Sequence, residues 1–132
     1  AKCSNSTYKS LNNFWKSLGS FTYNLTKNQH DTLMSQTSHI AHLMSYIFVQ
    51  SLPQSIINDN LSLLLGGGIK EHIRLSKSDP KMWTDIFINN KSNLIKSINR
   101  IEKNISNLKN MISESEVNKI KRLLSKIQAK TK

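Results

Sequence analysis

The chain is poor in cysteine, proline and glycine: its 132 residues include one Cys, two Pro and four Gly. A single cysteine, Cys3, excludes an internal disulfide and a cysteine-rich metal cluster, as is typical of proteins in a reducing compartment. The longest apolar runs, such as Leu63–Leu65 and Tyr46–Val49, fall far short of the roughly 20 residues that cross a bilayer, and the first residues lack a signal-peptide pattern. We therefore expect a cytoplasmic protein with no membrane partner.

Acidic residues are also scarce, because 8 Asp+Glu stand against 19 Lys+Arg and the formal net charge is +11. A basic balance of this kind is the usual mark of a nucleic-acid binder. Only three of the basic residues are Arg, however, and Arg is the residue that binds phosphate or guanine through two parallel hydrogen bonds. We favour a solvated lysine-rich surface and no nucleic-acid partner. The alternative is a non-catalytic basic helical module that binds nucleic acid, which requires one contiguous face of Lys side chains from Lys91 onward.

The chain has the length of one domain, so a complete two-domain enzyme does not fit. Apolar spacing predicts a helix over residues 7–18 that Gly19 ends. Alternation over residues 20–25 predicts one short strand, whose partner strands must lie elsewhere. Thr26 and Gln29 form a possible capping box before a helix of about 25 residues, over 27–52. Its apolar content predicts a central helix that is buried on most sides, with Ser and Ala leaving room for a neighbouring helix.

The rest of the chain also has helical periodicity, which makes the expected fold class mainly α with a long central helix and one short N-terminal strand. In chain order we first expect a short helix capped by Asp59 or Asn60 and ended by Gly66–Gly68, and then a helix that starts at Asp79–Pro80. A continuous helical stretch over 86–111 follows, and the last helix begins with a capping box of Ser113 and Glu116.

The possible sites are individually weak. Gly66–Gly68 lacks the fingerprint of a nucleotide-binding loop, so a helix-breaking turn is favoured over a binding loop. His39 and His42 share one helical face, but they lack the pattern and the third ligand of a zinc site. Either satisfied core histidines or a ligand-facing pair fits that spacing.

Arg74 is the only Arg among the first 99 residues, which makes it the natural candidate for binding a carboxylate with two hydrogen bonds. The competing interpretation is a surface salt bridge with Glu71, one turn earlier. Trp83 is assigned to core packing. These features predict a helical domain with a possible pocket for an anionic ligand.

Three stretches in the same order and spacing resemble the C-terminal helical domain of prephenate dehydrogenase. They are Ser38–His42 (SHIAH), Gly66–Arg74 (GGGIKEHIR) and Ser78–Phe87 (SDPKMWTDIF). The Ser-Asp-Pro-x-Met-Trp segment is the most specific of them. The resemblance covers nearly the whole chain, because Phe14–Gly19 and Gln29–Asp31 also look like the family's approach to its long helix.

The resemblance implies an enzyme that converts prephenate to 4-hydroxyphenylpyruvate by oxidative decarboxylation, on the route to tyrosine; some relatives prefer arogenate. In such an enzyme an N-terminal Rossmann-type domain binds NAD or NADP, and the helical domain supplies homodimerisation and part of the substrate pocket. Carried onto this chain, the resemblance implies these substrate-binding residues: Arg74 for a carboxylate, His39 and His42 as candidates to face the substrate, Trp83 to shape the pocket, and Gly67 and Glu71 to reach into the partner subunit's site.

The resemblance also implies a division of the chain into residues 1–25, the tail of the nucleotide-binding region, and residues 26–132, the dimerisation and substrate domain. Neither the dinucleotide fingerprint nor the family's catalytic histidine has a counterpart here, so we expect no catalytic or cofactor-binding residue in this chain and no activity from it alone. Three departures stand out. Ala41 replaces the family's usual Pro and should straighten the helix, Glu71 replaces an Asp, and His72-Ile73 replaces Phe-Thr.

Overall fold

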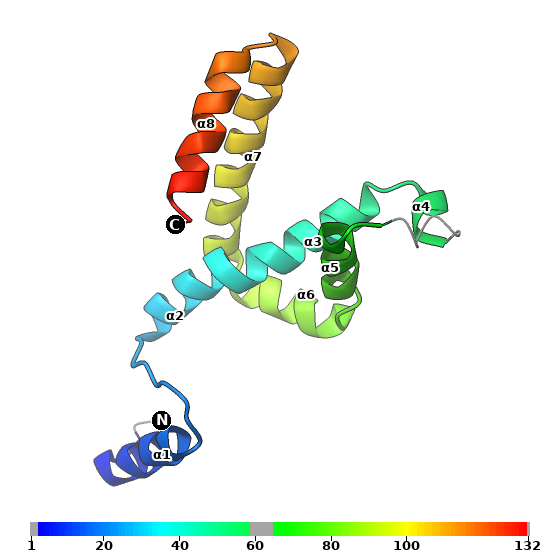
Figure 1. Ribbon diagram of the computed structural model, residues 1–132. Coiled ribbons are helices and arrows are strands. Elements are labelled where there is room, and N and C mark those ends of the chain that lie inside the picture. Colours follow the sequence, from blue (N-terminus) through cyan, green and yellow to red (C-terminus); the bar gives the residue numbers. More distant parts are fainter. Residues whose placement is uncertain (1–2, 59–64, 132) are drawn as a thin grey trace. The chain divides into compact units, whose positions relative to one another are not determined.

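The computed structural model describes residues 3–58 and 65–131, and within them all regular structure is helical (Figure 1). The chain divides into two units, residues 1–30 and 31–132. The mainly α fold class is therefore confirmed. No helix in the described part of the chain is long and apolar enough to cross a membrane.

The first unit contains α1 (Asn5–Ser17), which ends as its sequence predicts. The Ser4 hydroxyl accepts a hydrogen bond from the Thr7 backbone N–H at 3.1 Å and so caps the start of the helix. At the other end Gly19 has φ +79°, and its N–H donates to the Lys16 carbonyl at 3.0 Å. A left-handed residue of this kind closes a helix at little cost when it is glycine.

The predicted strand over residues 20–25 is wrong, because no strand occurs in the ranges that the structure describes. The segment instead hydrogen-bonds to α1 through side chains: the Tyr8 hydroxyl lies 2.9 Å from the Asn24 amide oxygen, and Thr22 bonds to Asn12. An alternating pattern becomes a strand only when a second backbone supplies the ladder of hydrogen bonds. Without that partner, Phe21 and Tyr23 remain exposed.

The long helix is confirmed, with an irregularity that was not predicted. Helices α2 (Lys27–Met34) and α3 (Ile40–Gln50) are joined by a π-helical turn, η1 (Ser35–His39). The capping box forms as expected, since the Thr26 N–H donates to the Gln29 side chain at 2.9 Å and the Gln29 N–H donates to the Thr26 hydroxyl at 3.2 Å. Ala41 lies in regular α-helix, so the irregular turn precedes it.

Small side chains line the contacts of the long helix with its neighbours, as predicted. Ser35 and Ser45 are buried on the long helix, and Ser97 and Leu94 are buried on α7 (Lys91–Ser113). Helix α3 is nevertheless less buried than expected, because Ser45 is its one buried residue. Apolar side chains on it, such as Phe48, stay partly exposed in this single chain.

The glycine run begins a helix that was not predicted, while the short helix that it was predicted to end falls mostly on residues outside the described ranges. After α4 (Gln54–Asn58), helix α5 (Gly67–Ser76) starts with Gly66 at its N-cap position. All three glycines have φ values outside the left-handed region, so none is required to turn the chain. The predicted cap at Asp59 or Asn60 lies outside the described residues.

Helix α6 (Pro80–Asn89) begins as predicted, because the Asp79 carboxylate accepts a hydrogen bond from the Met82 N–H at 2.7 Å and Pro80 occupies the first turn. The continuous helix over 86–111 is wrong. The chain breaks at Asn90, whose φ of −115° and ψ of 26° are not helical, and α7 starts again at Lys91. An asparagine tolerates such a position better than most residues.

Helices α7 and α8 (Val117–Ala129) lie side by side as a hairpin (Figure 1). The predicted capping box of Ser113 and Glu116 does not form, because Ser113 is the last residue of α7. Instead Ser115 takes a left-handed conformation with φ 53°, and the Glu116 N–H donates to the Met111 carbonyl at 2.9 Å. This is a helix end of the type at α1, with Ser in the place of Gly.

We expect Ser115→Gly to stabilise the hairpin by about 0.5–1 kcal/mol, because glycine adopts the left-handed region without the Cβ clash that serine suffers. Urea unfolding followed by circular dichroism measures the change. As the matched control, Ser106→Gly in the exposed middle of α7 should destabilise by about 0.5 kcal/mol. Equal destabilisation by the two substitutions would contradict the assignment of strain to Ser115.

Candidate functional site

Two of the predicted histidines meet Trp83 where the long helix packs beside α6. The His42 ring stacks on the indole with centroids 3.7 Å apart and planes at 21°, and the His39 ring meets it edge-on at 6.2 Å. Trp83 is 6% exposed, and its Nε1 has no hydrogen-bond partner among the described residues. His39, His42 and Trp83 therefore form an aromatic cluster, in which the indole of Trp83 is the buried ring.

The hydrogen bond of His42 defines which of its ring nitrogens carries a proton. Its Nδ1 lies 3.1 Å from the Ser38 carbonyl oxygen, four residues earlier. A carbonyl can only accept, so Nδ1 of His42 must donate. The ring is thereby tied to its own helix while it stacks on Trp83.

His39 contacts Asn90, which was not predicted as a site residue. The Asn90 amide nitrogen lies 2.6 Å from the Asp31 carbonyl oxygen and 3.3 Å from Nδ1 of His39. The Asn90 amide oxygen accepts from the Asn93 side chain at 2.9 Å. Asn90 is 9% exposed, and the helix break places it against the π turn. The adjacent pair Asn89-Asn90 was the signal for this break, since asparagine is a poor helix former.

A second cluster lies on α5, where Arg74 lines a groove of about 390 Å³. Two lysines, at positions 70 and 77, share this groove with Arg74 because residues four and three apart fall on one helical face. The remaining lining is apolar: Ile57, Leu65 and Ile73. The groove thus combines three cationic side chains with an apolar wall, which suits an anionic ligand that has a hydrophobic body. Spacing by three and four residues was the signal that could have found Lys70 and Lys77.

Arg74 pairs with Glu71 in this structure. Its Nε and Nη2 donate to the two carboxylate oxygens at 3.0 and 2.6 Å, so the pair is bidentate. Hydrogen bonding to Arg74 lowers the pKa of Glu71, and the same bond raises the pKa of Arg74, so both groups are charged at neutral pH. Both side chains are well exposed. The guanidinium is accordingly set up to hold a carboxylate, and in this chain Glu71 provides one.

Helix α5 is attached to the long helix through a buried hydroxyl. The Ser45 hydroxyl donates to the Ala41 carbonyl at 2.8 Å and lies 3.0 Å from Nδ1 of His72, whose ring also packs on Phe48 at 4.7 Å. Since the Ser45 proton is used, His72 donates in this contact. This link positions the helix that carries Arg74.

A family described as "Prephenate dehydrogenase, dimerization domain" matches residues 26–126. The chain belongs to this family.

Solved structures agree with the family. Prephenate dehydrogenase from Aquifex aeolicus, in a complex with hydroxyphenyl propionate and NAD+, aligns with a TM-score of 0.82 and 30% identity over 98% of this chain and 46% of that one. Arogenate dehydrogenase from Synechocystis shares the fold, with a TM-score of 0.76, at 21% identity over 97% of this chain and 47% of that one.

Curated relatives are more distant in sequence. Prephenate dehydrogenase of Bacillus subtilis is 24% identical over 80% of this chain and 29% of the relative, and cyclohexadienyl dehydrogenase of Zymomonas mobilis is 19% identical over 78% and 36%. The chain spans less than half of the length of each relative.

Within this prephenate dehydrogenase dimerization domain, the residues singled out from the sequence fall into separate groups. His39 and His42 join Trp83, Glu71 pairs with Arg74, and Gly67 is the first residue of α5. A Cβ added at Gly67 meets nothing within 4 Å, so packing inside the described chain does not require glycine there. No group of three metal-ligating side chains occurs among the described residues.

The dimerization domain does not fit a dinucleotide by itself. A nicotinamide dinucleotide binds at the carboxyl edge of a parallel sheet, with its pyrophosphate at a glycine-rich turn between strand and helix. The described residues contain no strand, and Gly67 and Gly68 are themselves the first residues of α5.

Proposed function

We propose that this chain is the substrate-binding and dimerisation domain of an enzyme that oxidatively decarboxylates prephenate to 4-hydroxyphenylpyruvate, on the route to tyrosine. Arogenate is the alternative substrate. NAD or NADP, bound by a separate nucleotide-binding domain, accepts the hydride in the intact enzyme, so this chain alone has no dehydrogenase activity. The proposal includes a cytoplasmic location and no nucleic-acid partner.

The observation that carries the proposal is the pairing of cationic and apolar side chains in the α5 groove. Prephenate is a dianion built on a six-membered ring, so it needs cations for its carboxylates and apolar surface for its ring. Arg74, flanked by Lys70 and Lys77, supplies the first, and Ile73 with Leu65 supplies the second. The hydroxyphenyl propionate of the Aquifex aeolicus complex has the same two chemical features.

Each candidate residue then has a distinct part. Arg74 exchanges its Glu71 partner for a substrate carboxylate, which costs little because the pair is exposed. His39 faces the substrate, with His42 beside it, and Trp83 shapes the pocket. Gly67 and Glu71 of one subunit reach into the site of the other, where the open space around Gly67 admits a second molecule.

Ligand binding to the chain tests the proposal. In a Trp15→Phe background Trp83 is the only tryptophan, so its fluorescence reports on the aromatic cluster during titration with hydroxyphenyl propionate. We expect Arg74→Lys to weaken binding at least about tenfold, because an ammonium cannot replace the two parallel hydrogen bonds of a guanidinium.

Arg100→Lys on α7 is the matched control and should leave the affinity unchanged. Equal affinities for the Arg74 and Arg100 variants would overturn the role of Arg74. No saturable binding to the parent protein would overturn a substrate site in this chain.

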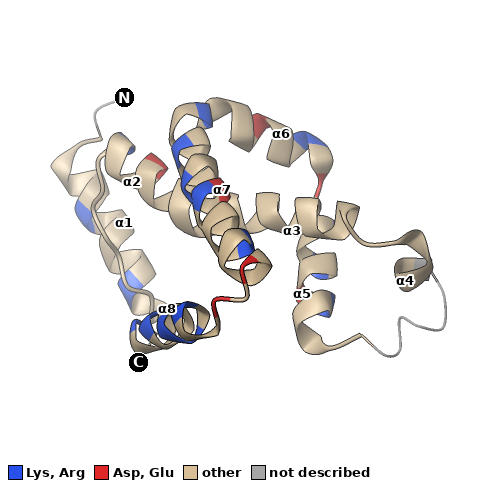
Figure 2. Cartoon of the chain, turned by 90° about the horizontal axis from the view of Figure 1, so that it is seen from above, with Lys and Arg blue, Asp and Glu red and all other residues tan. Residues whose placement is uncertain are grey.

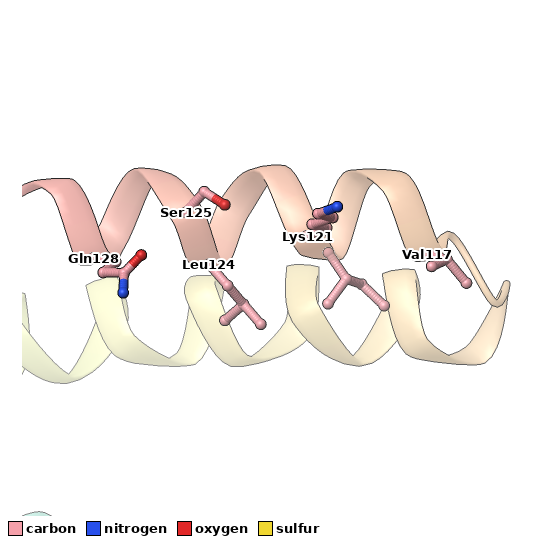
Figure 3. A pocket seen from close by; sticks show the side chains of 6 residues that line it. Val117, Lys121, Leu124, Ser125 and Gln128 are labelled. Atoms are coloured by element: carbon pink, nitrogen blue, oxygen red, sulfur yellow. The ribbon is translucent and has the colours of Figure 1, made fainter.

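The proposed partner is a second copy of this chain, and the surface that fits it is one side of α8. Val117 and Leu124 are 71% and 54% exposed, and they line a shallow apolar groove of about 610 Å³ (Figure 3). Another side of α8 already faces α7, through Leu123 and Ile127. The family's description as a dimerization domain supports a copy of the same chain as the occupant of the free side.

The charges on α8 are arranged so that two copies could meet there despite the net charge of +11. Lysine and arginine residues recur along this helix (Figure 2). Lys119, Arg122 and Lys126 are three and four residues apart, which places them on one side, away from Val117 and Leu124. Of the residues that line the groove, Lys121 is the only charged one. Contact between two such grooves would therefore bury apolar surface while the basic row stays in solvent.

A further inference from the structure

We infer that Asn90 is a positioning residue that holds His39 as a neutral imidazole with its proton on Nε2, opposite to the arrangement in His42. The inference deepens the proposed function and rests on it in one respect, the role of His39 toward the substrate. The protonation pattern itself follows from hydrogen-bond geometry.

The orientation of the Asn90 side chain is unambiguous. Its amide nitrogen lies 2.6 Å from the Asp31 carbonyl oxygen, which can only accept. Reversing the amide would place two oxygens against each other there. On its other side the Asn90 oxygen accepts from the Asn93 amide at 2.9 Å. Both contacts assign the nitrogen to the side that faces the long helix.

The nitrogen of Asn90 lies 3.3 Å from Nδ1 of His39, and an amide NH₂ group only donates. Nδ1 of His39 is therefore an acceptor and carries no proton. A neutral imidazole then has its proton on Nε2, which becomes a donor. A protonated ring would bring an N–H of His39 against an N–H of Asn90, so this contact also disfavours the charged form.

His42 provides the contrast within the same cluster. Its Nδ1 meets the Ser38 carbonyl at 3.1 Å and must carry a proton. Two histidines three residues apart, both against Trp83, are thus held with opposite ring nitrogens protonated. For a substrate that presents carboxylate and hydroxyl oxygens, a neutral His39 with its proton on Nε2 is a hydrogen-bond donor that carries no charge.

Nuclear magnetic resonance of protein labelled with ¹⁵N-histidine reads the protonated nitrogen of each ring directly. At mildly alkaline pH, where imidazole rings are neutral, we expect proton on Nε2 in His39 and on Nδ1 in His42. The spectrum of a His39→Gln variant assigns the His39 signals among the four histidines. A His39 ring with its proton on Nδ1 in the unaltered protein would overturn the inference, whatever the variants do.

Asn90→Asp tests the cause, because a carboxylate of the same shape can only accept and should move the His39 proton to Nδ1. Asn99→Asp, an exposed change on α7, the helix that follows Asn90, should leave both rings as they are. An unchanged His39 ring in folded Asn90→Asp would overturn the role of Asn90. If that variant does not fold, the same measurement on Asn90→Ser, which removes the amide donor, replaces it.

The affinity for hydroxyphenyl propionate tests the contact of His39 with substrate separately from the positioning of His39 by Asn90. If His39 donates to the ligand, Asn90→Asp should weaken binding at least about tenfold as the donor on Nε2 is lost. A proton that moves without any loss of affinity would overturn the contact of His39 with substrate and would leave the positioning by Asn90 intact.

Discussion

Replacing Trp83 by alanine is expected to destabilise the protein by about 3–5 kcal/mol, the largest effect of any single truncation in this chain. Trp83 and Leu94 are the buried apolar side chains of the core in the part of the chain that the structure describes. The indole also carries the stacked ring of His42 and packs against Phe87 at 5.5 Å. Its removal leaves a cavity among several elements, and urea unfolding followed by circular dichroism measures the loss.

Trp83→Phe separates ring packing from the indole N–H. Since Nε1 has no partner among the described residues, phenylalanine gives up no hydrogen bond and removes a buried unsatisfied donor. We expect a loss below about 1.5 kcal/mol, as for other near-isosteric core changes. Trp15→Phe, at a site 46% exposed, is the matched control and should be close to neutral. A Phe variant as unstable as the Ala variant would show that the N–H has a partner in solution.

The features that were predicted correctly are those whose cause lies within a few residues. Gly19 ends α1, Thr26 and Gln29 cap each other, and Asp79 caps the helix that Pro80 begins. Each depends on a side chain that satisfies backbone groups one turn away, so local sequence is sufficient.

Most of the features that were missed depend on distant parts of the chain, whereas the Ser113–Glu116 capping box failed locally because α7 continues through Ser113. The alternation over 20–25 has no partner backbone among the described residues, and Asn90 breaks a periodic helix where it bonds to Asp31, 59 residues away. The start of α5 at the glycine run was also missed, because glycine is compatible with the end of one helix and with the start of the next. In each case the sequence pattern is real, and a tertiary contact or a neighbouring segment decides the outcome.

In the candidate site, too, local features were predicted and those that depend on distant residues were missed. Helical spacing alone placed His39 and His42 on one face, the scarcity of arginine singled out Arg74 as a carboxylate binder, and the resemblance added a pocket role for Trp83. Spacing did not indicate that Glu71 would be the observed partner of Arg74 in preference to a ligand, although that pair was the stated alternative. Nor did it indicate which nitrogen of each histidine is protonated, because that depends on backbone carbonyls and on Asn90, which lies between α6 and α7.

Leu124→Glu on α8 is expected to convert the proposed homodimer into monomers at micromolar concentration and to raise the dissociation constant at least about 100-fold. In a two-fold symmetric interface one substitution places two carboxylates in the contact. Burying an unpaired charge costs several kcal/mol, and each 1.4 kcal/mol corresponds to about a tenfold change in affinity. Because Leu124 is 54% exposed in the single chain, folding of the monomer should be little affected. Sedimentation equilibrium measures the association, and circular dichroism checks the fold.

Arg122→Glu is the matched control, because it introduces the same side chain into the same helix but on the side that carries the basic row. It lowers the positive charge more than Leu124→Glu does, so a general effect of net charge on association would appear more strongly in it. We expect it to remain dimeric. Dissociation by both variants would attribute association to charge rather than to the apolar groove, and a Leu124→Glu protein that stays dimeric would place the interface elsewhere. A parent protein that is monomeric at micromolar concentration would overturn the homodimer itself.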